Sequence, residues 1–587
     1  MTKWRNLKEA VGALPAGRWL FDYTREQLQG DVTAGATVGV MLIPQAMAYA
    51  LLAGVPAVYG LYASLVPLLL YPMLGTAPRL AVGIVALDML AVGAGLAALG
   101  PASPAQAASW AMTVAMMVGV IHLVLATLRL ELVFRLMSRP VIAGFMVAAP
   151  LLIGLSQLST LLGVSIERTD HILVNTWRTL ELAQEANLQE LALGLSAMVL
   201  LVAMRVAWKT FPRALALVLM SGALVWAVAP EVAVVGALDG ELPGFALPDL
   251  SPGLMRDLLP TAATVVLLQI ISVASLGKSL GSAEDGPAPE PTSELRALGA
   301  MNVLGSMFGS VPVSASFSRT AVNASAGAQT PMANAVSAIL VATSILLLSS
   351  SFAFVPKSSL AAIILVASFG SVDFEETRAL FALERSEGWL ALLTTAATLI
   401  IGIQEGVLIG VAASVLHLLH RLSRPDVVAL GKNPGDEIED NPFRSVEEND
   451  DVNAIEGVLI LRIDGSLSFT NVARVRALVL ERLDDRGVEA ISTVILDGRG
   501  INVVDSTALS ELSDLLDELE EQEVEIHFVA LKARVREAFC RAGLDERLDP
   551  VEMRQSPERV LAEVLASDDE DAPPPPPGES DAEPMEP

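Results

Sequence analysis

Residues 32–59 read VTAGATVGVMLIPQAMAYALLAGVPAVY, a run that carries no charge. Roughly twenty apolar residues are enough to cross the hydrocarbon core of a bilayer as a helix. Pro44 and Gln45 interrupt the run, and a proline removes a backbone hydrogen bond that lipid cannot replace. The stretch therefore predicts a membrane-spanning helix that is broken near Pro44, where the side chain of Gln45 faces something other than lipid.

The composition extends this prediction to most of the chain. Of the 587 residues, 53% are apolar, and the mean hydropathy is +0.54, which is typical of an integral membrane protein. The net charge of -28 is unevenly placed, since residues 426–587 contain 40 acidic and 15 basic residues and the preceding part has a balance of only -3. An acidic soluble region is thus expected to begin near Arg424–Pro425.

Apolar segments recur fourteen times before this boundary. Several are too short to cross a bilayer, and half-helices of this kind often mark the binding sites of secondary transporters. The segments are 32–52, 56–75, 80–99, 110–128, 140–163, 190–208, 214–235, 258–281, 298–310, 317–328, 334–352, 357–370, 388–402 and 405–419.

Two of these segments, the third (80–99) and the tenth (312–328 with its lead-in), begin with small residues, so that free backbone N–H groups can face a ligand. They hold corresponding places in two sets of seven. An odd number of spans per set predicts a 7+7 inverted repeat with both chain ends on the cytoplasmic side. The basic residues of the lead-in 1–29, which shows no signal peptide, and Arg421 and Arg424 agree with that orientation.

The C-terminal region follows a different pattern. Buried strands are expected at 457–465 and 493–498 and helices at 471–487 and 506–522, which together predict a small α/β domain over 425–566. The acidic, proline-rich tail 567–587 is expected to be disordered. Cys540, which is the one cysteine of the sequence, is predicted to be a packed thiol. The sequence offers no metal-ligand cluster, no cofactor motif and no enzyme active site.

The motifs of the chain resemble the SulP family of sulfate permeases, whose animal members form solute carrier family 26. The resemblance rests on GDVTAGATVGVMLIPQAMAYALLAGVPAVYGLYAS at 30–64, on ELRALGAMNVLGSMFGSVPVSASFSRTAVNASAGAQTP at 294–331, and on DSTA at 505–508. It implies a fourteen-segment fold (30–424) divided into core and gate domains, with half-helices in segments 3 and 10. It also implies a cytoplasmic STAS domain and a homodimer.

The same resemblance places an anion site between the first, third, eighth and tenth segments. Two half-helix N-termini that point at one cavity suit an oxyanion, because each carries a partial positive charge and free amides. Gln45, Tyr49 and the serines also have a purely structural interpretation as helix cap or packing residues, whereas a guanidinium inside a membrane is costly unless it is paired or hydrated. The candidate substrate-binding residues are Gln45, Tyr49, Val85, Ala86, Ser316, Phe317, Ser318 and Arg319.

Asp88 is the most unusual residue of the third segment, because a carboxylate there costs about 2.5–3.5 kcal/mol to insert. Several proton-coupled relatives place a glutamate in the eighth segment, where this chain has Gln269. We therefore expect Asp88 to supply the proton site and to pair with Arg319, the alternative being a static ion pair.

Sodium coupling is the rival prediction. In that case Asp88 and either Ser272 or Ser275 would complete an oxygen cage around the ion. Lys278 is expected to reach the membrane interface rather than the substrate.

In the STAS domain, the soluble relatives of the family carry a phosphorylated hydroxyl that maps to Ser506 or Thr507. The same two residues are suited to cap a helix, with Asp505 adding favourable charge, and for a transporter we expect the capping role.

The sequence thus predicts a secondary active transporter of a small inorganic oxyanion, sulfate first, by proton symport. A sodium-coupled bicarbonate transporter, a dicarboxylate carrier, an anion exchanger or channel, and an environmental sensor remain alternatives. The expected partners are the anion, a proton or sodium ion, the lipid bilayer and a second copy of the chain, without nucleic acid. The expected location is the inner (plasma) membrane, as a multi-pass protein with the N-terminus and the STAS domain in the cytoplasm.

Overall fold

The structure is a computed structural model of the 587-residue chain. It describes residues 15, 19–128, 138–166, 169, 171–207, 213–228, 231–237, 240–279, 290–370, 372, 374–433, 443–449, 451–486 and 491–570. Residues 571–587 of the predicted tail (567–587) and most of the predicted lead-in lie outside the described residues, whereas residues 567–570 are helical rather than disordered.

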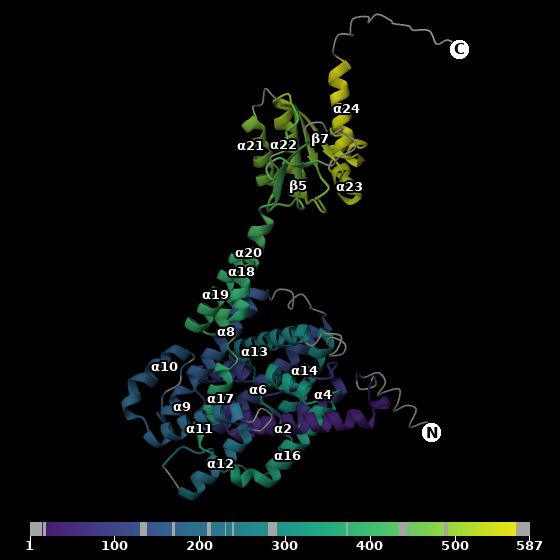
Figure 1. The fold of residues 1–587 in the computed structure, drawn as a ribbon. Coiled ribbons are helices and arrows are strands. Elements are labelled where there is room, and N and C mark those ends of the chain that lie inside the picture. Colours follow the sequence, from purple (N-terminus) through teal and green to yellow (C-terminus); the bar gives the residue numbers. More distant parts are fainter. Residues whose placement is uncertain are drawn as a thin grey trace, which may run out of the picture. The chain divides into compact units, whose positions relative to one another are not determined.

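The chain forms two compact units, Met1–Ser414 and Val415–Pro587, and the first is helical (Figure 1). The elements of its first half are α2 (Arg25–Leu52), α3 (Ala57–Tyr62), α4 (Val66–Leu74), β1 (Val82–Gly83), α5 (Ala86–Leu99), α6 (Pro104–Thr127), α8 (Arg139–Ser156), α9 (Leu158–Leu162), α10 (Ile172–Glu181), α11 (Leu188–Ala207) and α12 (Arg213–Val228). Those of its second half are α13 (Pro252–Ser279), α14 (Pro291–Ser306), β2 (Ser314–Ala315), α15 (Phe317–Ser325), α16 (Met332–Phe352), α17 (Lys357–Phe369), α18 (Glu375–Leu383), α19 (Arg385–Ile400) and α20 (Ile403–Leu422), which continues into the second unit.

Within the described residues, each of the fourteen predicted apolar segments overlaps one helix or, for 56–75 and 140–163, two consecutive helices. Among the described residues, eight helices are long and apolar enough to cross a membrane, and α5, α12 and α17 are shorter apolar helices. The third and tenth segments are short helices, each preceded by a short strand, as the half-helix prediction requires. The inverted relation of the two sets of seven stays a prediction with which this arrangement is consistent.

Helix α2 corrects the prediction of a broken first segment. It begins with a capping box in which Thr24 and Gln27 bond each other's backbone N–H groups, and it continues through Pro44 to Leu52. The proline leaves the carbonyl of Val40 without its helical partner. Because Val40 lines a cavity, water can satisfy that carbonyl and the helix need not break.

The helices pack in two groups that each combine both halves of the sequence. In one group α2 packs on α16 and α6 on α14, and in the other α8 packs on α19 and α11 on α17 (Figure 1). Small residues allow these close contacts, since a Cβ on Gly35 of α2 would lie 2.4 Å from the carbonyl oxygen of Ala333 in α16. Between the groups, α2 also contacts α12 and α17.

The second unit confirms the predicted α/β domain. Its five-stranded sheet has the order β4-β3-β5-β6-β7, in which β5, β6 and β7 run parallel and β3 runs antiparallel to β5. Core residues of α21, α22 and α23 pack together with those of the sheet, and a separate cluster joins the sheet to α24. The elements are β3 (Asp426–Gly431), β4 (Arg444–Ser445), β5 (Gly457–Asp464), α21 (Val472–Arg486), β6 (Ile491–Asp497), α22 (Ser506–Glu521), β7 (Glu525–Val529), α23 (Ala533–Arg541) and α24 (Pro557–Glu570).

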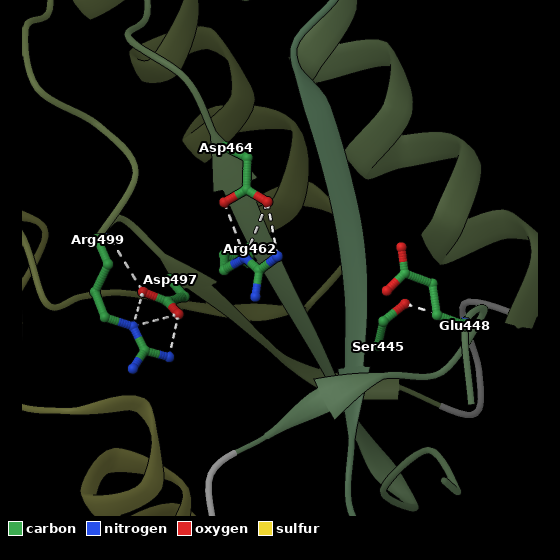
Figure 2. Close-up of polar contacts among 6 residues, drawn as sticks. All are labelled: Ser445, Glu448, Arg462, Asp464, Asp497 and Arg499. Atoms are coloured by element: carbon green, nitrogen blue, oxygen red, sulfur yellow. Dashed lines mark hydrogen bonds and ion pairs between the residues drawn. The ribbon is translucent and has the colours of Figure 1, made fainter. Parts of the chain in front are cut away.

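Charged pairs lie at the carboxyl ends of two central strands of this sheet. Figure 2 shows Arg462 bonded to Asp464 on β5, and Arg499 bonded through its backbone and side chain to Asp497 at the end of β6. Asp497 is fully buried, so its carboxylate is satisfied by Arg499 rather than open to a ligand. Cys540 is exposed at the end of α23, and the prediction of a packed thiol is wrong, because the helix buries its neighbours Ala538 and Phe539 instead.

Candidate functional site

The two half-helices α5 and α15 meet through the strands that precede them. Strand β1 pairs with β2 in antiparallel fashion, with Val82 opposite Ala315. The residues at the N-caps of the two helices, Val85 and Ser316, make no side-chain capping bond. The first amides of both helices thus have no side-chain cap, and each helix start carries a partial positive charge.

A cavity of about 930 Å³ is lined by both helix starts and by parts of α2, α8, α11, α12 and α17. Gln45 and Tyr49 of α2 and Ser316 and Ser318 of the tenth segment supply amide and hydroxyl groups to its wall. The Oε1 atom of Gln45 is buried without a hydrogen-bond partner. Among the described residues that line this cavity, none is acidic. The wall therefore offers hydrogen bonds and positive potential, which suit an anion.

The structure gathers most of the residues that the sequence singled out. Six of the eight candidate substrate-binding residues line the cavity. The side chain of Phe317 lies outside the described residues, and Arg319 is behind the wall rather than part of it. The six are Gln45, Tyr49, Val85, Ala86, Ser316 and Ser318.

Arg319 is a buried cation next to this cavity. Its side chain is 1% exposed, and its Nε and Nη2 atoms have no hydrogen-bond partner. The guanidinium lies against Gly83, where a Cβ would stand 3.2 Å from Nη2. A buried guanidinium with two unpaired nitrogens is unfavourable, so an anion bound at the neighbouring helix starts would relieve part of its electrostatic cost.

Asp88 belongs to a buried polar network that joins three helices. Its Oδ2 atom accepts a 2.9 Å hydrogen bond from Nε2 of Gln269 on α13, whose Oε1 atom in turn lies 3.5 Å from Nδ2 of Asn302 on α14. Asn302 also accepts from the backbone N–H of Val313 at 2.9 Å and donates to its carbonyl at 3.0 Å. Since Val313 directly precedes β2, the network reaches from Asp88 to the lead-in of the tenth segment.

The expected ion pair between Asp88 and Arg319 is not formed in this conformation. Both side chains are described, and no ion pair within 4.0 Å joins them. Gln269 occupies Oδ2 of Asp88, while the guanidinium is turned toward Gly83. Arg319 still interacts electrostatically with Asp88 and with Tyr49. The two charges thus interact through space without a direct ion pair.

The residues of the sodium prediction are only partly described. Ser272 donates its hydroxyl to the Leu268 carbonyl of its own helix at 3.0 Å. The side chains of Ser275 and Lys278 lie outside the described residues. In the part of the chain that the structure describes, no group of three His, Cys, Asp or Glu side chains is placed to hold a metal ion.

A second asparagine bonds to the backbone at β1 in the same way as Asn302 bonds to the backbone of the residue before β2. Asn334 of α16 accepts a 3.1 Å bond from the N–H of Val82 and donates a 2.8 Å bond to the carbonyl of Leu80. Both asparagines are buried. The two extended segments are therefore fixed to helices of the surrounding group, and with them the direction of both helix starts.

Buried carboxylates that sequence reasoning missed fix the loops beside these segments. Asp31 of α2 accepts hydrogen bonds from the backbone N–H groups of Gln329 and Thr330, at 2.8 and 2.9 Å. Glu294 of α14 accepts from the backbone N–H of Thr76 at 2.7 Å. Both are fully buried. Asp31 directly precedes the uncharged run 32–59, and Glu294 lies between Glu290 and Arg296, so neither stands out in the sequence as Asp88 does.

Sequence reasoning also missed Arg205 and Arg213, which line the cavity at the end of α11 and the start of α12. Basic residues at the ends of apolar segments usually extend to the membrane interface. The sequence alone gives no signal that separates a residue at a cavity mouth from one that faces lipid headgroups.

The sequence pattern described as "Sulfate permease family" matches residues 28–394, well over half of the chain. The chain belongs to the sulfate permease family. The pattern of the STAS domain matches residues 449–558. The family assignment confirms the resemblance noted in the sequence and makes the chain a multi-pass membrane protein.

Named relatives extend over nearly the whole length. The chloroplastic sulfate transporter 4.1 of Arabidopsis thaliana is 32% identical over 550 residues, covering 91% of this chain and 79% of the relative. A probable sulfate transporter of Mycobacterium tuberculosis is 32% identical over 534 residues, covering 90% of this chain and 93% of the relative.

Solved structures share the fold. SLC26A9 superposes with a TM-score of 0.85 at 23% identity, covering 97% of this chain and 96% of that one. The transmembrane domain of the cyanobacterial bicarbonate transporter BicA gives a TM-score of 0.57 at 22% identity, covering 67% of this chain and 98% of that domain.

In this sulfate permease family member, the STAS candidates lie at the start of α22. Asp505 is the N-cap, and its carboxylate accepts from the backbone N–H of Ala508 at 2.8 Å and from that of Phe469 at 2.8 Å. Ser506 and Thr507 are exposed first-turn residues, so the prediction that they cap the helix is wrong. The carboxylate takes that role because it reaches the third amide of the helix. Phosphorylation of the exposed hydroxyls stays untested.

Proposed function

We propose that the chain is a secondary active transporter that carries a small inorganic oxyanion, sulfate first, by proton symport. The observation that carries the proposal is the convergence of two uncapped half-helix starts on one cavity, with Arg319 buried behind them without a hydrogen-bond partner for Nε or Nη2. Oxyanions bind to such helix starts through backbone N–H groups and the helix dipole. The names of the relatives support sulfate as the first anion to test.

Asp88 is proposed as the proton site. Asp88 is 1% exposed, and the donor that bonds its Oδ2 atom is a neutral amide, that of Gln269. A proton added to Asp88 and an anion added near Arg319 change the charge of the same buried region in opposite senses. Each binding event therefore lowers the electrostatic cost of the other, which is the cooperativity that symport requires.

The cavities support a carrier rather than an open channel. The N-cap Val85 and the first residues of α5, Ala86 and Leu87, line the large cavity. Later residues of the same helix, Leu90, Gly93 and Ala94, line a distinct cavity of only about 50 Å³. Helix α5 thus contributes residues to two cavities of very different volume, as expected for a site that is open widely to one side only. With the N-terminus and the STAS domain in the cytoplasm of an inner-membrane protein, as we propose, the wide cavity faces the cytoplasm.

The test is radiolabelled sulfate uptake into proteoliposomes with the membrane potential clamped at zero. One pH unit across the membrane supplies about 1.4 kcal/mol per proton, so one-proton symport accumulates sulfate up to about tenfold. Asp88→Asn keeps the size and an oxygen acceptor for Gln269 but cannot titrate. It should retain sulfate–sulfate exchange and lose gradient-driven accumulation, whereas Asp257→Asn, an exposed acid on α13, should behave as wild type.

Four outcomes would contradict the proposal in different ways. Proton-driven accumulation by Asp88→Asn would exclude this residue as the proton site. Sodium-dependent bicarbonate flux without sulfate uptake would show that the protein is a sodium-coupled bicarbonate transporter. Strong inhibition of uptake by fumarate would indicate a dicarboxylate carrier. Flux that only dissipates a gradient would indicate a channel.

A further inference from the structure

Two arginines form the charged end of the large cavity. Arg205 lies in the last turn of α11 and Arg213 in the first turn of α12, and both line the cavity together with Thr33 and Thr37 near the start of α2. These two are the charged residues among the described residues of the wall. Consecutive spans alternate in direction, so the start of α2, the end of α11 and the start of α12 belong to one face of the membrane.

The described part of the chain offers neither arginine an acidic partner within ion-pair distance. Among the described residues, no ion pair or hydrogen bond involves the guanidinium of Arg205 or Arg213. Arg205 reaches the end of α17, since a Cβ on Gly370 would stand 3.5 Å from Nη1. A cation at the C-terminal end of a helix is favourable, so stabilisation of α17 could by itself explain the position of Arg205.

That alternative does not account for Arg213. A cation in the first turn of a helix opposes the helix dipole and typically costs about 0.3–1 kcal/mol. Arg205 lies close enough to add like-charge repulsion. Two cations held near each other at the mouth of a cavity with no acid in its described wall create a positive field that low-dielectric walls focus inward.

We propose that Arg205 and Arg213 form a second anion site at the cavity mouth, which takes doubly charged oxyanions before they reach the starts of α5 and α15. The inference rests on the proposed function and adds a separate site to it. Arginine is suited to this task because its planar guanidinium binds an oxyanion through two parallel hydrogen bonds. Focusing of this kind raises the association rate of a charged ligand by about 10- to 1,000-fold and weakens as salt screens the field.

The test uses a single-cysteine chain and needs no transported substrate. Cys540→Ser removes the exposed native thiol, and Thr37→Cys places a thiol in the cavity wall. The labelling rates of an anionic sulfonatoethyl and a cationic trimethylammonioethyl methanethiosulfonate are compared in full-length protein in liposomes. We expect the anionic reagent to be favoured by at least about tenfold relative to free cysteine, and the preference to fall at about 0.5 M KCl.

The double variant Arg205→Gln Arg213→Gln should abolish this preference, and Arg213→Lys should restore most of it. Arg256→Gln removes the same charge from an exposed position near the start of α13, the eighth span, and should change nothing. Sulfate, added against gluconate at constant ionic strength, should slow labelling in the wild-type background and not in the double variant.

Equal preference in the double variant and the parent would overturn the proposal. So would failure of both reagents to label Thr37→Cys, because the cavity would then be closed at this end. If the labelling preference depends on the two arginines as expected but the protein takes up no sulfate in the transport assay, the anion site is supported and sulfate is excluded as the transported substrate.

Discussion

Substitution of Asn302 by alanine should disable the site without touching any residue of the cavity wall. The Asn302 side chain forms two hydrogen bonds to the backbone of Val313, 2.9 Å from its N–H and 3.0 Å from its carbonyl. Val313 is fully buried, so neither group can turn to water when the amide is removed. An unsatisfied buried group costs about 1–3 kcal/mol, and the two together cost about 2–6 kcal/mol.

This cost falls on the arrangement that directs the start of α15 into the cavity. At about 1.4 kcal/mol per factor of ten, even the lower bound disfavours that arrangement about thirtyfold. We expect the KM for sulfate in proteoliposomes to rise by at least about tenfold. The thermal unfolding temperature of the purified variant should also fall, because the lost bonds stabilise the fold as well as the site.

The matched control is Asn502→Ala, an exposed asparagine of the STAS domain whose loss should change stability by no more than about 0.5 kcal/mol. A KM for Asn302→Ala within twofold of the wild-type value, together with an unchanged unfolding temperature, would refute the reasoning. In that case the backbone of Val313 would be satisfied by water or by another side chain.

Two further predictions concern the half-helix junction and the soluble domain. Gly83 has a φ of 144°, a conformation that costs other residues about 1–3 kcal/mol, so Gly83→Ala should lower sulfate uptake at least tenfold. The control Gly244→Ala, where a Cβ meets nothing within 4 Å, should transport normally. Equal uptake by both variants would show that β1 tolerates a side chain. Partial loss of hydration and the nearby Asp545 carboxylate raise the pKa of the Cys540 thiol. Maleimide labelling of the native chain should therefore be slow at neutral pH and accelerate only at a higher pH than labelling of free cysteine does. Asp545→Asn should shift this pH profile to lower pH, and an unshifted profile would assign the raised pKa to hydration alone.

The sequence predicted the positions of the half-helices because their chemistry is local. Short apolar segments with small residues at the start indicate helices that end inside the membrane, and α5 and α15 begin at Ala86 and Phe317 accordingly. The prediction failed at Pro44, because whether a proline breaks a helix depends on what surrounds the carbonyl it leaves free. A sequence does not show that the free carbonyl belongs to a residue of a cavity wall.

The site was predicted less completely than the fold. Asp88 and Arg319 were recognisable as charges inside apolar segments, but their partners depend on contacts between distant segments. The bond from Gln269 to Asp88 spans 181 positions, and no local pattern encodes it. Arg205 and Arg213 were overlooked for a related reason, since the same residue types at helix ends usually meet lipid headgroups.

Because of the two-residue ladder between β1 and β2, the proposed anion site is built from two parts of the chain that are distant in sequence. Val82 and Ala315 come from opposite halves of the membrane unit, and each half contributes one helix start to the cavity. A chain divided in the connection between α12 and α13 would give two fragments that each retain seven of the fourteen segments. Neither fragment alone would hold an anion. Activity would return only by complementation, when both fragments are made in one cell and the ladder re-forms between two separate polypeptides.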